Sequence, residues 1–230
     1  MNSSTTPASE PTTSSKSRKA RIAVWILMGL MVLTGTLGFA VARSTAGTAP
    51  QDAGQVVRAN SRVLSQAPDE KAQLVEFLDF ECEACLAAYP FVEELREEHG
   101  DTVTFIDRYF PLPGHRNSMN AAIAVESAAQ QGKYEAMYHK MFRTQKDWGG
   151  SADDKSAVFR GYAQELGLDM AAYDRAVADP ATAARVQADK ADGLALGISG
   201  TPTFFLNGKP LVADSLEEFR ALVEKAAGRP

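Results

Sequence analysis

The chain has 230 residues, 45% of them hydrophobic and 23% charged, which is the composition of a globular protein with room for one buried core. Residues 1–43 hold five basic residues and one acidic residue, whereas residues 44–230 hold 19 basic and 28 acidic residues. Binding of nucleic acid needs clustered lysine and arginine to neutralise phosphates, so this acidic balance argues against a nucleic-acid-binding protein.

The N-terminal region has the pattern of a membrane anchor. Residues 1–21 are rich in serine, threonine and proline, end in a basic patch, and are expected to form a disordered cytoplasmic tail. Residues 22–42 contain no charge, and as a helix they would span about 31 Å, enough to cross a bilayer. More basic residues precede this segment than follow it, which predicts a cytoplasmic N-terminus and a single-pass protein in the cell membrane.

A cleaved signal peptide is the alternative for the same segment. Residues 40–42 (Ala-Val-Ala) fit a small-x-small cleavage pattern, although 21 uncharged residues exceed the usual apolar core of a signal peptide. Under both interpretations the remainder of the chain is exported, to a compartment where disulfides can persist.

Residues 43–60 consist largely of small and polar residues and are expected to form a linker, so the folded domain is predicted at 61–230. The mostly apolar run 73–78 predicts a buried strand. A helix is predicted at 83–99 from the spacing of its apolar residues, and a second strand at 102–110.

The long region that follows is rich in alanine and poor in strand-forming residues. It predicts four helices and a short turn of helix near 169–178; the helices are at about 117–131, 133–145, 153–167 and 180–196.

The C-terminal region has the signals of a hairpin and a closing helix. A third strand is predicted at 203–206, and Asn207-Gly208 predicts a tight turn into a fourth strand near 210–212. Ser215, with Glu218 three residues later, forms a capping-box pattern at the start of a helix that ends near residue 227. The order of these elements predicts a small α/β sheet with a helical insertion.

Cys82 and Cys85 are the two cysteines of the chain. A bridge between them would close almost no loop, so it would constrain the unfolded chain little and suits chemistry better than structure. The pair lies where a strand is predicted to end and a helix to begin, and the free N–H groups there would stabilise a Cys82 thiolate. Cys85, one turn further on, would then resolve the mixed disulfide.

Other uses of a Cys-x-x-Cys pair require further residues nearby. A c-type haem site would need histidine after the second cysteine, but residue 86 is leucine. A structural zinc site would need two more ligands, and the three histidines (His99, His115 and His139) are scattered, so we predict no metal and no cofactor. An inert, packed pair stays open.

Glu76 lies inside an apolar strand six residues before Cys82. A buried carboxylate is costly and usually has a raised pKa, so Glu76 could take the proton of Cys85 as that sulfur attacks. The alternative is an edge position at which Glu76 is solvated.

Three stretches of the sequence resemble the DsbA-like branch of the thioredoxin superfamily: 75–85 (VEFLDFECEAC), 108–115 (RYFPLPGH) and 200–209 (GTPTFFLNGK). The resemblance implies an α/β thioredoxin-like fold with a helical insertion at about 116–197. It implies that Cys82 is the nucleophile and Cys85 the resolving cysteine, and that Glu76 is the buried acidic residue. It further implies that Pro202 is a cis-proline facing the cysteines, with Thr201 offering backbone groups to a substrate. The role of His115 stays open.

The function implied is a thiol–disulfide oxidoreductase that forms or reshuffles disulfides in unfolded or reduced exported proteins. A membrane redox partner of the DsbB or vitamin K epoxide reductase type would recharge it.

This chain departs from its strongly oxidising relatives, which have a histidine where Glu83 stands, and Asp79 and Glu81 add further negative charge. Such charges oppose thiolate formation, so we expect a pKa for Cys82 well above the ~3.5 of those relatives. A dedicated reductase for cytochrome or copper-protein maturation therefore stays open, as does a non-enzymatic copper-binding thiol domain.

Overall fold

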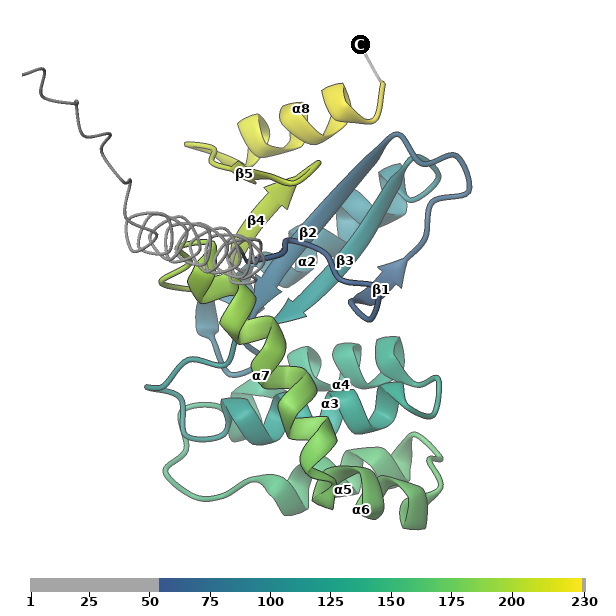
Figure 1. Ribbon diagram of the computed structural model, residues 1–230, viewed down its shortest axis with the longest axis vertical. Helices are drawn as coiled ribbons and strands as arrows, with labels where there is room; N and C mark the ends of the chain where they lie inside the picture. The colour runs from purple at the N-terminus through teal and green to yellow at the C-terminus, as the bar shows by residue number, and fades with distance from the viewer. Residues whose placement is uncertain (1–53, 229–230) are drawn as a thin grey trace, which may run out of the picture. The chain divides into compact units, whose positions relative to one another are not determined.

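The computed structural model describes residues 54–228, and their helices and strands are labelled in Figure 1. In chain order they are β1 (Arg62–Ser65), β2 (Ala72–Leu78), α2 (Glu83–His99), β3 (Val103–Tyr109), α3 (Ser118–Ala129), α4 (Tyr134–Trp148), α5 (Ser156–Glu165), α6 (Met170–Ala178), α7 (Pro180–Ala195), β4 (Thr203–Leu206), β5 (Lys209–Leu211) and α8 (Leu216–Ala226).

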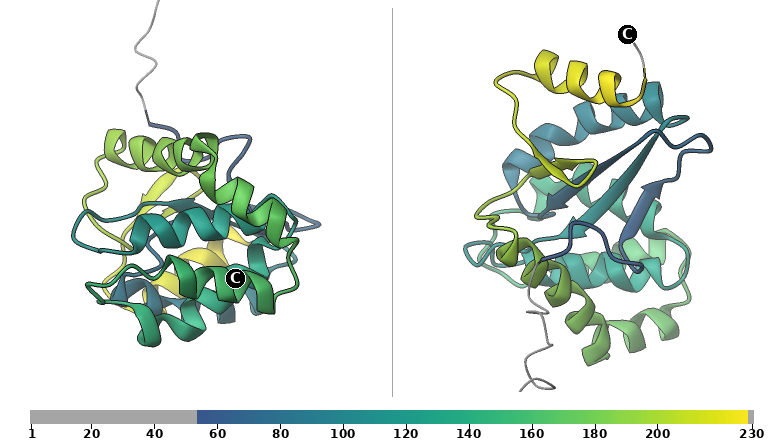
Figure 2. Two further views of the ribbon diagram at one scale, coloured as in Figure 1. Left: turned by 90° about the horizontal axis from the view of Figure 1, so that it is seen from below. Right: turned by 45° about the horizontal axis from the view of Figure 1, so that its top comes forward.

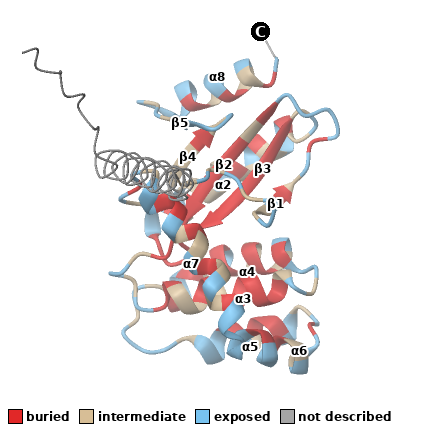
Figure 3. Cartoon of the chain, in the orientation of Figure 1, coloured by how far each residue is buried: buried red, intermediate tan, exposed pale blue. Residues whose placement is uncertain are grey.

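The strands form one sheet in the order β1-β3-β2-β4-β5. The central strands β2 and β3 are parallel, and the outer pairs are antiparallel. The two central strands are buried along nearly their whole length, which explains their largely apolar sequences (Figure 3). Three predicted strands match β2, β3 and β4, while β5 starts one residue earlier than predicted. The edge strand β1 was missed, because it has four residues and an irregular register.

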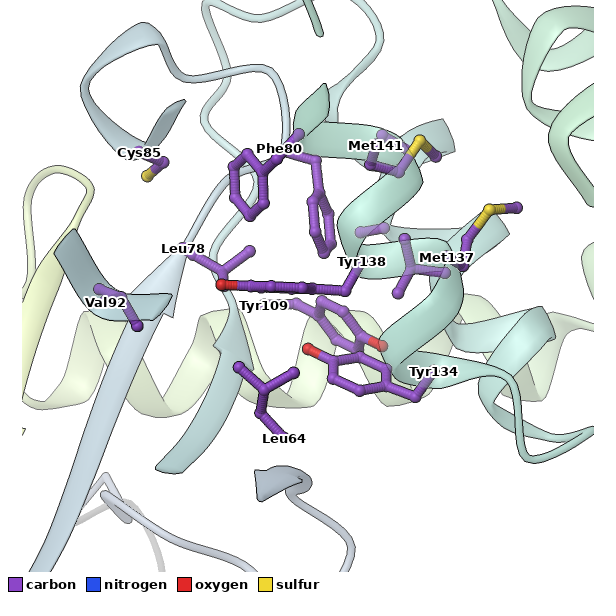
Figure 4. Close-up of a cluster of buried hydrophobic side chains, with 14 of the residues drawn as sticks. Leu64, Leu78, Phe80, Cys85, Val92, Tyr109, Tyr134, Met137, Tyr138 and Met141 are labelled. Carbon is purple, nitrogen blue, oxygen red and sulfur yellow. The ribbon is translucent and has the colours of Figure 1, made fainter. Parts of the chain in front are cut away.

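Side chains alternate between the two faces of the sheet. Leu74, Leu78, Phe105 and Tyr109 belong to the larger apolar cluster, which includes side chains of α2, α3, α4 and α8. Figure 4 shows Tyr134 and Tyr138 reaching from α4 into this cluster. In the right-hand view of Figure 2, α8 lies beside α2, and their ring contact is Phe91–Phe219, with centroids 5.4 Å apart.

The opposite face of the sheet carries a smaller apolar cluster that includes Val75, Phe77 and Phe110. Helix α7 lies against this face at Gly193, where an added Cβ would come within 2.6 Å of the Phe110 ring. The glycine therefore allows the helix to approach the sheet closely.

The predicted helical insertion is confirmed. Helices α3 to α7 gather beyond the end of the sheet toward which β3 points (Figure 1). The segment at 169–178, predicted as a short turn, is a helix of nine residues, α6. Its N-terminus is capped by the Asp169 side chain, which accepts a hydrogen bond from the N–H of Ala172.

The C-terminal predictions are confirmed in detail. Asn207 and Gly208 both have positive φ, 51° and 75°, as a tight hairpin turn requires. Ser215 caps α8 by accepting from the N–H of Glu218, and the Glu218 carboxylate accepts from the N–H of Asp214.

The buried Arg108 on β3 joins the segment before β1 to α7. Arg108, with no exposed surface, donates from Nε to Asp189 (2.6 Å) and from Nη2 to Asp192 (2.5 Å). Its Nη1 donates to the carbonyl groups of Gln55 (2.8 Å) and Val56 (2.7 Å). Gln55 and Val56, which belong to the predicted linker 43–60, are thus hydrogen-bonded to the folded domain.

The predicted tail and membrane anchor, residues 1–42, lie outside the described residues. Among residues 54–228, no helix combines the length and the hydrophobicity needed to cross a bilayer.

Candidate active site

The two cysteines lie at the start of α2, with Cys82 as its N-cap residue and Cys85 in its first turn. Both are reduced, and both are buried, Cys82 with 7% of its surface exposed. The Cys82 sulfur lies 3.4 Å from the carbonyl oxygen of Thr201, and the Thr201–Pro202 peptide bond is cis. The structure thus brings together four residues that the sequence singled out from distant segments.

The electrostatic surroundings make the two sulfurs unequal. The pKa of Cys82 is lowered to about 5, chiefly by a hydrogen bond from the Cys85 thiol. Burial opposes this shift, while the side chain of Thr201 and the backbone N–H groups of Ala84 and Cys85 support it. Burial, followed by the hydrogen bond to Cys82 and the charge of Glu76, raises the pKa of Cys85 far above its ordinary value. Cys82 is therefore a thiolate at neutral pH, and Cys85 is a thiol.

This difference predicts a pH-dependent stability of the reduced protein. A thiol whose pKa falls on folding stabilises the folded state above its unfolded pKa, and that stabilisation is lost as pH falls toward the folded value. The melting temperature of reduced protein relative to oxidised protein should therefore rise between about pH 5 and about pH 8.5. Calorimetry of both forms checks this, and a difference that does not change with pH would contradict the lowered pKa.

Glu76 lies on the central strand β2 with 5% of its surface exposed. The alternative that placed it at a solvated edge is wrong. Burial, together with the charges of Asp107 and Cys82, raises the pKa of Glu76 well above its ordinary value. The charges of Glu76 and Cys85 also interact, so a protonated carboxyl group lies near the resolving sulfur.

Two acidic side chains near Cys82 accept hydrogen bonds from backbone N–H groups. Asp79 accepts from the N–H groups of Glu81 (2.8 Å) and Leu112 (2.9 Å). Glu81 accepts from the N–H groups of Asn117 (2.6 Å) and Gly150 (3.1 Å). Sequence reasoning treated both only as charges opposing the Cys82 thiolate, whereas they also tie the active-site turn to two loops of the helical insertion.

Gln145 on α4 is a site residue that sequence reasoning missed. Its side-chain amide, buried, donates to the carbonyl groups of Phe80 (2.8 Å) and Cys82 (2.9 Å). These two bonds fix the backbone on both sides of Glu81. Nothing in the sequence signals the pairing, because the residues lie more than 60 positions apart.

His115 belongs to the same site. Its Nδ1 lies 2.6 Å from Asp79 Oδ2, and 30% of its side chain is exposed. Burial opposes protonation, but the bond to Asp79 and the nearby Cys82 thiolate raise the pKa of His115. Protonated His115 therefore places a positive charge close to the Cys82 sulfur.

Replacing His115 with glutamine should raise the pKa of Cys82 by about half a unit, because the thiolate loses a nearby positive charge. The ultraviolet absorbance of the thiolate, followed against pH, measures this. His139→Gln is the matched control, since the Nδ1 atom of His139 on α4 pairs with the hydroxyl of Tyr89. Equal titrations of the two variants would exclude the proposed charge effect.

A groove of about 620 Å³ lies beside the active-site turn, between the first turns of α2 and the end of α4. Leu86, Ala87 and Pro90 provide its apolar wall, and its charged residues are Glu81, Glu83 and Lys146. In residues 54–228 no three side chains of histidine, cysteine, aspartate or glutamate are grouped so as to hold a metal ion.

Comparison with known families places the fold. Residues 65–225 match the family model described as thioredoxin. The chain belongs to the thioredoxin family. A thioredoxin-like oxidoreductase of Silicibacter pomeroyi is 27% identical, with 79% of this chain and 100% of that chain covered and a TM-score of 0.63. Oxidised BdbD of Bacillus subtilis is 19% identical (76% and 97% covered, TM-score 0.65). The fold is also similar to that of α-DsbA1 of Wolbachia pipientis (19% identical, 75% and 93% covered, TM-score 0.64), so within the family the fold is DsbA-like.

Among curated proteins, the chain resembles part of longer ones. It is 38% identical over 145 residues to a Na(+)/H(+) antiporter NhaA 1 of a Mycobacterium species, which covers 62% of this chain and 23% of that protein. An NhaA of Herminiimonas arsenicoxydans is 34% identical over 204 residues, covering 87% of this chain and 32% of that protein. The chain spans a third or less of the length of these relatives.

Proposed function

We propose that this protein is an extracytoplasmic thiol–disulfide oxidoreductase that forms or reshuffles disulfides in reduced or unfolded exported proteins. The observation that carries the proposal is the pair of unequal sulfurs at the start of α2: an ionised Cys82 beside the Thr201 carbonyl, and a protonated Cys85 behind it. Fold similarity to DsbA-like proteins supports the same chemistry.

In the oxidising direction, a client thiolate attacks the Cys82 sulfur of the Cys82–Cys85 disulfide. The bond between the two cysteines breaks, its electron pair goes to Cys85, and a mixed disulfide joins Cys82 to the client. A second client thiolate then displaces Cys82, which leaves easily because its thiolate is stabilised. The client gains a disulfide, and the protein is left reduced.

The backbone groups next to Pro202 suit the binding of an extended client chain. The Thr201 carbonyl, already close to the Cys82 sulfur, lies beside the position that the client cysteine must occupy. Thr201 and Pro202 are therefore proposed as substrate-binding residues.

Location and redox partner are part of the proposal. A membrane anchor at residues 22–42 would hold the domain outside the cytoplasm, near a membrane partner of the DsbB or vitamin K epoxide reductase type. That partner would restore the Cys82–Cys85 disulfide after each turnover.

The redox potential of the cysteine pair tests the proposal and shows whether the protein oxidises or reduces its clients. Thioredoxin, with a cysteine pKa near ~7, has a potential of ~−270 mV, and DsbA, with ~3.5, has ~−120 mV. A Cys82 pKa of about 5 predicts a value between the two.

Equilibration with glutathione measures the redox potential. Refolding of a reduced, disulfide-dependent test protein measures the formation of disulfides in a client. A potential at or below that of thioredoxin would favour the dedicated reductase. Stoichiometric copper that blocks exchange with glutathione would favour the copper-binding domain. A pair that never exchanges with glutathione in metal-free protein would refute the proposal.

A further inference from the structure

Asp107 is a buried carboxyl group that the exchange chemistry described above does not use. It lies in the middle of β3 with 2% of its surface exposed. It shares the sheet face of Phe105 and Tyr109, which belong to the apolar cluster around α2 and α4. Tyr134 Oη donates to Asp107 Oδ2 at 2.7 Å. A carboxylate in such apolar surroundings is costly, so Asp107 needs a physical explanation.

Its neighbour across the sheet is Glu76. The parallel strands β2 and β3 pair Glu76 directly with Asp107. Parallel strands lie about 4.8 Å apart, and paired residues point to the same face, so the two carboxyl groups lie side by side. Glu76 accordingly shares its face with Leu74 and Leu78, on the side of α2.

Two adjacent carboxyl groups in a dry environment cannot both ionise readily. Burial raises the pKa of Asp107 to about 7. Burial, and next the charge of Asp107, raises the pKa of Glu76 well above its ordinary value. The pair therefore keeps at least one proton at neutral pH, and its two titrations are coupled.

The groups around the pair come from two helices. Helix α2 and its N-cap residue contribute Cys82, Cys85, Glu93 and Arg96, whose charges act on one carboxyl group or the other. Helix α4 contributes Tyr134 and Tyr138, and His139 contacts Glu93 at the outer end of this cluster. The buried Tyr138 hydroxyl has no hydrogen-bond partner among residues 54–228, so it offers one more proton-bearing group here.

We propose that Glu76 and Asp107 form a carboxyl dyad that retains one shared proton at neutral pH and passes it to the Cys85 sulfur when the Cys82–Cys85 disulfide opens. This inference rests on the proposed function and assigns a role to a residue outside it.

The client thiolate bonds to Cys82, the Cys82–Cys85 bond breaks, and its electron pair leaves on Cys85. Burial makes this new thiolate a strong base, so the shared proton moves from Glu76 to Cys85, and water returns a proton to the dyad. In the reducing direction the dyad takes the proton back as Cys85 attacks. Asp107 touches no sulfur in this scheme, and it acts by keeping Glu76 protonated.

The test uses the Asp107→Asn variant, which preserves the size of the side chain and removes its charge. Without that charge Glu76 ionises at a lower pH. The measured quantity is the rate at which oxidised protein reacts with a single-cysteine peptide, normalised to the thiolate fraction of the peptide. This rate should decrease as the pH rises, and in the variant the decrease should occur about one pH unit lower than in wild type. Glu126→Gln is the matched control, since Glu126 is a buried carboxyl group bonded to Arg62 and Tyr109. Its profile should not move.

Infrared spectroscopy of the carboxylic acid band gives a readout that needs no client. Wild type should show two coupled protonation steps, and Asp107→Asn should show one, at a lower pH than the upper step of wild type. Superimposable profiles, or an Asp107 that titrates independently, would overturn the dyad even if exchange is normal. If no variant exchanges with glutathione, the proposed function fails, and the infrared titration of wild type still decides the dyad.

Discussion

Replacing Cys82 with serine should lower the rate of disulfide exchange roughly a thousand-fold or more, because a serine hydroxyl stays protonated and cannot form a disulfide. Replacing Cys85 with serine should have a different result. The Cys82 thiolate of this variant still attacks a disulfide of a client, but the Cys85 thiol that would release Cys82 from the resulting mixed disulfide is missing, so covalent complexes with disulfide-bonded clients should accumulate. Non-reducing electrophoresis and a glutathione exchange assay separate the two outcomes.

The geometry also predicts how the Cys85→Ser variant titrates. The hydrogen bond from Cys85 is the main cause of the lowered pKa of Cys82, and a serine hydroxyl can still donate it. Cys85→Ala cannot, so the pKa of Cys82 should be higher in the alanine variant than in the serine variant. Trapping by Cys82→Ser instead of Cys85→Ser would reverse the assigned roles.

The largest effect on stability is expected at Arg108. Its guanidinium is fully buried between Asp189 and Asp192, and it bonds two backbone carbonyl groups before β1. Arg108→Met leaves two buried carboxylates without their central partner, which should lower the free energy of unfolding by about 3–5 kcal/mol. Urea denaturation of the variant measures the change.

Arg160→Met is the matched control for this change, because Arg160 pairs with Asp174 on the surface, where both side chains are 48% exposed. An exposed ion pair contributes only about 0–1 kcal/mol, so this variant should unfold close to wild type. Equal losses of unfolding free energy in the two variants would mean that the buried ion pairs of Arg108 stabilise the fold no more than an exposed pair does.

The fold was largely predictable because its elements carry local signals. Strand β2 is a mostly apolar run, Asn207-Gly208 has the chemistry of a tight turn, and Ser215 with Glu218 caps the last helix. Strand β1 escaped prediction because four residues with polar ends carry no clear period, and only its pairing with β3 defines it.

The site was predictable only where the residue type and its local pattern indicate the chemistry. Two cysteines at helical spacing and a glutamate inside an apolar run are visible in one segment of sequence. Asp107 carries no comparable signal within the strand predicted at 102–110, since its pairing with Glu76 depends on the register of two strands 31 positions apart. Gln145 and the contact between His115 and Asp79 are products of tertiary structure, and no spacing in the chain encodes them.

The amide of Gln145 gives the helical insertion a direct mechanical connection to the reacting sulfur. It donates hydrogen bonds to the main chain on either side of Glu81, so a small rotation of the last turn of α4 would displace the Cys82 sulfur relative to Thr201. Substitutions far from the two cysteines, in the packing of α4 against α3 and α5, could then tune how readily this protein accepts electrons while the cysteine motif itself stays unchanged.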